Sequence, residues 1–183
     1  MRTSFARTLL AALTCALPLL AGTAHAASKA ELDAESKRVF EKLIADVPAA
    51  RALNERALAV LVFPGITKAG FMVGGQYGEG VLWKRGKPVA YYNNAGASYG
   101  LQAGAQKYGY AMFFMTKKGL EALDATKGFE VGVGPSVVVV DQGMAKSMTS
   151  TTITDDVYAF IFGQKGLMAG IGIQGNKITK ISK

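Results

Sequence analysis

The chain has 183 residues, half of them hydrophobic, and carries 21 lysines and arginines against 13 acidic residues, a formal charge of +8. The only cysteine, Cys15, and the only histidine, His25, lie close to the N-terminus. A mature chain without that segment has no thiol or imidazole, which excludes cysteine or serine–histidine catalysis, zinc held by thiolate or imidazole, and histidine-ligated haem.

Residues 1–26 have the pattern of a signal peptide that is removed on export. Arg2 and Arg7 give a positive start, a short apolar stretch follows, and Ala24-His25-Ala26 fits a cleavage site for small residues. The apolar stretch is too short to cross a bilayer comfortably. We therefore expect an exported protein without a retained membrane helix.

Cleavage after Ala26 leaves residues 27–183, a length that predicts a single domain with a substantial core. Loss of two arginines leaves 19 basic against 13 acidic residues, a charge of +6. This balance favours anionic surfaces such as phospholipid headgroups, and nucleic acid is not an expected partner of an exported protein. The expected location is periplasmic or secreted, with peripheral membrane association left open, and lipidation of Cys15 is the alternative to cleavage.

The start of the mature chain, residues 27–57, predicts helices. Ser28 followed by Glu31 is a capping-box pattern, in which each side chain accepts one free N–H of the first turn. Pro48 is suited to open a second short helix that ends near Arg56. Apolar residues recur at helical spacing along one face of the first helix: Leu32, Val39, Phe40, Leu43, Ile44 and Val47.

The remainder, residues 58–183, predicts mainly strands, because 21 of the 22 glycines lie between Gly65 and Gly175. The apolar run Leu58–Phe63 predicts a buried strand. Short strand candidates follow, including a hairpin with its turn at residues 84–88. A brief helix near residues 117–125, capped by Thr116, interrupts the strands.

These elements together predict an α+β fold. Glycine at this density inside strands marks bulges, bends and close backbone approach. We therefore expect N-terminal helices packed on a strongly curved, glycine-rich antiparallel sheet that is partly closed and barrel-like. Such a sheet, with the first helix, is expected to cover an apolar cavity or groove.

The candidate contacts with a lipid headgroup lie at the expected hairpin tip and in the brief helix: Trp83, Lys84, Arg85, Lys87, Lys117 and Lys118. Tryptophan prefers the headgroup level of a membrane, and each lysine near anionic lipid contributes about 1 kcal/mol. The alternative is an ordinary solvated turn.

No motif predicts catalysis, a metal or a cofactor. The glycine-rich stretch 74–80 has neither a phosphate-binding pattern nor a following helix, and no calcium loop is present in the sequence. A hydrolase that uses distant carboxylates, with Glu79, Asp141 and Asp155 as candidates, is the least favoured alternative. We expect that the protein is not an enzyme.

Four ordered blocks of sequence resemble the SYLF domain, also called the Ysc84 actin-binding domain. They are Lys68–Phe71 continuing through Gly74–Leu82, Ser98–Gln106, Lys118–Leu120, and Lys165–Ile171. The likeness covers about residues 53–178 and is strongest to the bacterial exported members.

The resemblance implies binding rather than catalysis. Eukaryotic relatives bind phosphoinositide-containing membranes and some bundle actin, whereas bacterial members are usually described as lipid-binding. For this chain the resemblance implies a non-enzymatic lipid-binding protein of the cell envelope, which takes anionic phospholipid or an acyl chain. Actin is not expected beside an exported protein, and a homodimer is left open. The alternative is a small outer-membrane or envelope structural protein, since the length permits an eight-stranded barrel.

Overall fold

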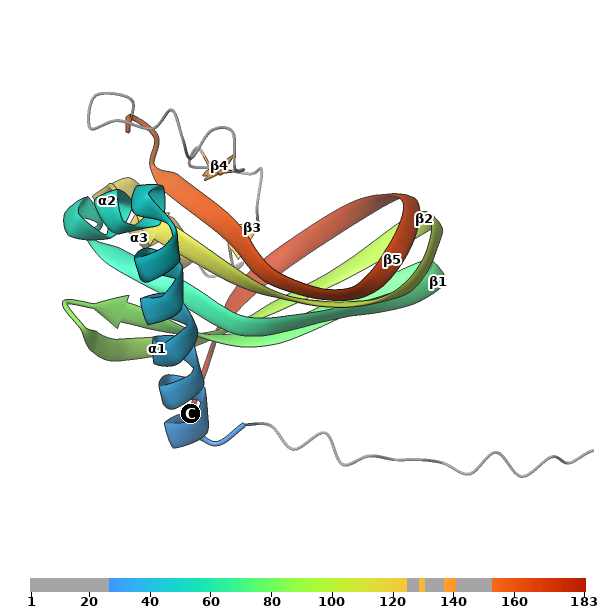
Figure 1. Cartoon of the computed structure of the whole chain (residues 1–183), viewed down its shortest axis with the longest axis horizontal. Coiled ribbons are helices and arrows are strands. Elements are labelled where there is room, and N and C mark those ends of the chain that lie inside the picture. The colour runs from blue at the N-terminus through green and yellow to red at the C-terminus, as the bar shows by residue number, and fades with distance from the viewer. Residues whose placement is uncertain (1–26, 125–128, 131–136, 141–152) are drawn as a thin grey trace, which may run out of the picture.

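The computed structural model describes residues 27–124, 129–130, 137–140 and 153–183 (Figure 1). The expected signal peptide and Asp141 lie outside these residues. In chain order the elements are α1 (Lys29–Asp46), α2 (Pro48–Arg56), β1 (Ala59–Lys84), β2 (Lys87–Phe114), α3 (Lys117–Leu123), β3 (Phe129–Glu130), β4 (Val137–Val139) and β5 (Val157–Ile181).

The strands form one strongly curled sheet in the order β1-β2-β5-β3, with antiparallel neighbours, and β4 pairs with β5 (Figure 1). This confirms an α+β fold with N-terminal helices on a curved sheet. The β4–β5 pair is parallel and departs from the expected antiparallel pattern.

The short strands expected from the sequence are in fact parts of three very long ones. β1 folds back on itself about Met72, whose φ of 59° lies in the left-handed region. Added Cβ atoms at Gly80 and Gly78 would lie 2.6 Å from the Phe63 ring and 2.8 Å from the Ile66 side chain. Glycine at these positions therefore lets the returning half of the strand lie directly against the outgoing half.

The two layers of the core lie on opposite faces of the outgoing strands. One face packs against the helices through Leu43, Ala50 and Leu53. On the same face the rings of Phe113 and Phe160 meet edge to face, with 5.6 Å between their centroids. The other face is covered by the returning strands, with Phe63, Tyr92 and Ile178 fully buried. Burial on both faces explains the continuous apolar run that begins β1.

Polar side chains fill part of the space between outgoing and returning strands. Gln76 Nε2 donates to Asn94 Oδ1 at 2.9 Å, and the Tyr108 hydroxyl donates to Gln76 Oε1 at 3.0 Å. Gln76 and Asn94 are buried. These hydrogen bonds therefore occupy part of the inside of the fold-back.

Candidate functional site

A groove runs between α1 and the outer face of the sheet. It consists of two adjoining hollows of about 370 Å³ and 420 Å³, which share Glu35, Pro64 and Lys107. Volumes of this size fall in the range of small-molecule sites in proteins. These two hollows correspond to the groove that we expect from the sequence between the first helix and the curved sheet.

The first hollow has an apolar floor. Val39, Leu43 and Val47 come from the helical layer, and Pro64 and Phe162 come from β1 and β5. Phe162 lies directly over Gly109, where an added Cβ would meet the aromatic ring. The absence of a side chain at Gly109 therefore allows this ring to lie flat against the sheet.

Four cations surround that floor, and they differ in their partners. Arg38 lies 3.8 Å from Glu35, and Lys42 lies 2.6 Å from Asp46. Lys107 and Lys165 are directly opposite each other in the β2–β5 register. Within the part of the chain that the structure describes, neither of these two lysine side chains has an ion pair or a hydrogen bond. Like charges directly opposite on a sheet are destabilising.

The charge of the groove is set by a separation between helix and sheet. The three long strands contain seven lysines and one acidic residue, Glu79. In contrast, α1 carries five carboxylates and four cations. Anions that approach the groove therefore meet a basic sheet wall, and the helix wall is close to neutral.

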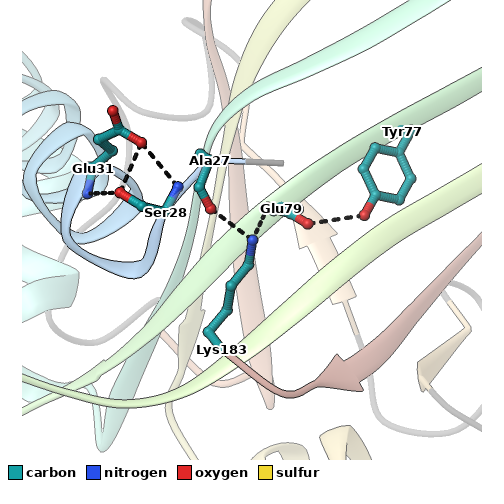
Figure 2. A network of polar contacts seen from close by, with 6 residues as sticks. All are labelled: Ala27, Ser28, Glu31, Tyr77, Glu79 and Lys183. Atoms are coloured by element: carbon teal, nitrogen blue, oxygen red, sulfur yellow. Dashed lines mark hydrogen bonds and ion pairs between the residues drawn. The ribbon is translucent and has the colours of Figure 1, made fainter. Parts of the chain in front are cut away.

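The single strand carboxylate is already neutralised. Figure 2 shows Lys183 reaching between Ala27 and Glu79, with Nζ 2.7 Å from Glu79 Oε2 and 2.8 Å from the Ala27 carbonyl oxygen. The Tyr77 hydroxyl donates to Glu79 Oε1 at 3.1 Å. These contacts close the end of the second hollow and tie the start of α1 to the end of β5.

The two tyrosines beside the groove are neutral hydrogen-bond donors. Burial raises the pKa of Tyr108, and burial followed by the hydrogen bond to Glu79 raises the pKa of Tyr77. Neither ring therefore adds negative charge to the groove at neutral pH, and neither serves as a base.

Among the candidates from sequence, the turn cations are placed as expected. β1 and β2 are joined by a two-residue turn in which Arg85 and Gly86 have φ of 52° and 73°, typical of a tight hairpin. Lys84, Arg85 and Lys87 are exposed. Neither hollow of the groove is lined by them, and their role in headgroup contact stays a prediction.

The two lysines of α3 differ from each other. Thr116 caps this helix as expected, accepting from Gly119 N–H at 3.1 Å. Both side chains are exposed, but only Lys118 has an ion pair within the described residues, with Nζ 3.2 Å from Asp156 Oδ2. Figure 1 places α3 and the β1–β2 turn toward the same end of the long axis, opposite the curled ends of the strands.

Trp83 is half-buried between α1 and the sheet, and its Nε1 donates to Ser36 Oγ at 2.8 Å. We expect Trp83→Phe to lower the free energy of unfolding by about 1–2 kcal/mol, because the fully buried Ser36 hydroxyl loses its donor. Urea unfolding measures this loss. Adding Ser36→Ala should recover much of it, since removing both partners is nearly neutral. A variant of unchanged stability that loses affinity for vesicles would instead make Trp83 a membrane contact.

Lys107 and Lys165 are the groove cations that sequence reasoning did not select. Neither has another cation close to it in the sequence, unlike the cluster at the β1–β2 turn. The available signal was the lack of any acidic residue from Lys87 to Phe114 and from Val157 to Ile181.

Residues 27–124, 129–130, 137–140 and 153–183 contain neither a candidate metal site nor a candidate membrane-spanning helix. Within these ranges no three acidic, cysteine or histidine side chains gather in a way that could hold a metal ion. In the same residues no helix combines the length and apolar character needed to cross a membrane.

Residues 95–183 match the family described as Ysc84: Las17-binding protein actin regulator. The match begins within β2, runs to the end of β5 and so includes both Lys107 and Lys165. No curated protein matches the chain.

Proposed function

Because the chain belongs to the Ysc84 family, which is associated with lipid and actin binding, we propose that it is a non-enzymatic lipid-binding protein of the cell envelope. Its ligand is an anionic phospholipid, held in the groove beside α1. The observation that carries this proposal is the pair Lys107 and Lys165, which face each other above an apolar floor and have no counterion among the described residues.

The groove offers one surface to each end of a phospholipid. A phosphate between Lys107 and Lys165 would replace their mutual repulsion with two attractions, in a partly enclosed site where charge interactions are less screened than in water. Val39, Leu43 and Phe162 offer apolar surface to the first part of an acyl chain. An apolar hollow with few convergent polar groups is the usual form of a small-molecule site.

We also propose that the protein is exported and that it is not an enzyme. The signal-peptide pattern of residues 1–26 supports a periplasmic or secreted location. The composition of residues 27–183, without cysteine or histidine, supports binding rather than catalysis. Lipid is preferred to actin as partner because an exported chain meets anionic lipid on the membranes around it.

Vesicle flotation of the purified protein tests the proposal. We expect flotation with vesicles that contain phosphatidylglycerol or cardiolipin, and little with vesicles of phosphatidylcholine alone. Raising the salt from about 0.01 M to about 0.15 M shortens the screening length from roughly 30 Å to 8 Å, so binding should weaken without vanishing. Equal binding to neutral and anionic vesicles, or to neither, would contradict an anionic ligand.

A further inference from the structure

The fold-back of β1 exposes three consecutive apolar side chains. Phe71 is 75% exposed, Met72 49% and Val73 62%. Exposed apolar residues that occur singly are normal on proteins, but a contiguous group at a projecting point marks an interaction surface. In Figure 1 the curled ends of β1, β2 and β5 project away from α1 and α2.

The backbone holds these side chains outward. Met72 has a positive φ, which is uncommon for a residue other than glycine. The β1–β2 register shifts between Phe71 and Val73, where Met72 alone stands opposite residues 100–102 of β2. Strained backbone of this kind persists where the surrounding structure imposes it, often at functional sites.

Beside Phe71, the described residues of the neighbouring strand are small. Phe71 is opposite Ala103, and the adjacent register pair is Gly70 with Gly104. Ala103 and Gly104 are themselves exposed. Residues this small leave the Phe71 ring open to the surroundings.

We define the apolar tip as Phe71, Met72 and Val73. Two lysines lie near this tip, further along the strands. Thr67, Lys107 and Lys165 form one row across β1, β2 and β5. That row is five residues from Met72, at most about 17 Å along the strand. Side chains that enter a membrane interface reach about 5–10 Å into it. The lysine row would then stand at the level of the headgroups.

We propose that the tip inserts into the interface of an anionic bilayer and so orients the protein with its lysine row against the headgroups. This inference rests on the proposed function and adds the mode of membrane attachment. It makes the curled ends of the strands, rather than the β1–β2 turn, the part of the molecule that enters the membrane.

Charge and size favour a bilayer over a second copy of the chain. The lysines nearest the tip on the three strands are Lys68, Lys107 and Lys165, and the one glutamate of these strands is paired with Lys183. Two copies meeting at their tips would bring these like charges together. Three side chains also fall far short of the roughly 800 Å² per partner that a stable protein interface buries.

The first test compares two surface variants in vesicle binding. Phe71→Ser with Val73→Ser should lower affinity for phosphatidylglycerol vesicles at least tenfold, and folding should be retained because both side chains are exposed. Val89→Ser is the matched control, since Val89 is 53% exposed beside the β1–β2 turn at the far end of the molecule. It should change affinity by less than twofold.

A second experiment measures how deeply the apolar tip enters the bilayer. In a Cys15→Ser background, Val73→Cys or Val89→Cys provides the only thiol of the chain for a fluorescent label. On anionic vesicles that carry a quencher in their acyl chains, the label at position 73 should be quenched and the label at position 89 should not.

The outcomes separate the two proposals. If the unaltered protein binds anionic vesicles but the tip variant binds equally well, or the label at position 73 is not quenched, insertion is wrong and the groove proposal stands. If the unaltered protein binds no vesicles, both proposals fail. If Phe71→Ser with Val73→Ser abolishes self-association seen by sedimentation, the tip is a protein interface and insertion is overturned.

Discussion

Replacing both Lys107 and Lys165 by glutamate should lower the affinity for anionic vesicles by at least about 100-fold. Each lysine near anionic lipid contributes about 1 kcal/mol, and reversal adds repulsion of similar size to the loss of attraction. Two reversals therefore remove roughly 3–4 kcal/mol, and every 1.4 kcal/mol is a factor of ten in affinity. Flotation or vesicle titration at constant ionic strength measures the change.

The matched control is the cluster that the sequence favours. Lys84→Glu, Arg85→Glu and Lys87→Glu together reverse three charges at the exposed turn, which is away from the groove. If the groove is the binding site, this triple variant should lose less affinity than the double variant, although it reverses more charge. The opposite order would move the site to the turn.

The free energy of unfolding provides a second, independent test of the role of Lys107 in the groove. The single variant Lys107→Glu places a carboxylate directly opposite Lys165 and turns a repulsive pair into an attractive one. Opposite charges at such a position stabilise a sheet by about 0.2–1 kcal/mol. We therefore expect a variant that is slightly more stable yet binds lipid less well. A loss of both stability and binding would indicate that Lys107 has a structural role.

Replacing Gly70 by alanine should lower the free energy of unfolding by at least about 2 kcal/mol. An added Cβ would collide with Gly74 Cα and lie 2.7 Å from the Val73 carbonyl oxygen and 2.9 Å from Gly74 N. These are backbone atoms on the returning side of the bend, and no rotation of a side chain relieves the contact. Overpacking of this kind typically costs 1–3 kcal/mol, and here it opposes the bend itself.

Gly75→Ala is the matched control, five residues along the same strand. The nearest atom to an added Cβ there is the Gly96 carbonyl oxygen at 3.8 Å, an ordinary contact. Alanine should be neutral or stabilise by up to about 1 kcal/mol, because it restricts the unfolded chain. Urea unfolding with unchanged slope compares the two variants. Equal stability for both would show that the fold-back does not depend on close approach at Gly70.

Much of the local structure could be predicted from the sequence because it depends on neighbours in the chain. Ser28 and Glu31 form the expected capping box, with Glu31 Oε2 accepting from Ser28 N–H at 2.9 Å. The turn at Arg85 and Gly86 is also as predicted. Each of these features needs only residues within a few positions of one another.

Trp83 has a contact that its neighbours in the sequence do not reveal. Tryptophan beside three cations fits a headgroup contact, but the indole N–H is bonded to Ser36, which is 47 residues earlier in the chain. The partner becomes apparent only when α1 packs across the sheet. A sequence pattern cannot distinguish an aromatic residue that faces solvent from one that fastens a helix.

By itself the sequence determined the helical start, the curved glycine-rich sheet, the basic charge and the family resemblance, because composition and short-range pattern encode them. Only the tertiary structure decided which lysines meet and which apolar residues project. Lys107 and Lys165 are 58 positions apart, and their pairing depends on strand register, which shifts just beyond Lys107. The apolar tip depends on the fold-back at Met72. Register and bending arise from contacts between distant segments, so no local stretch of sequence contains them.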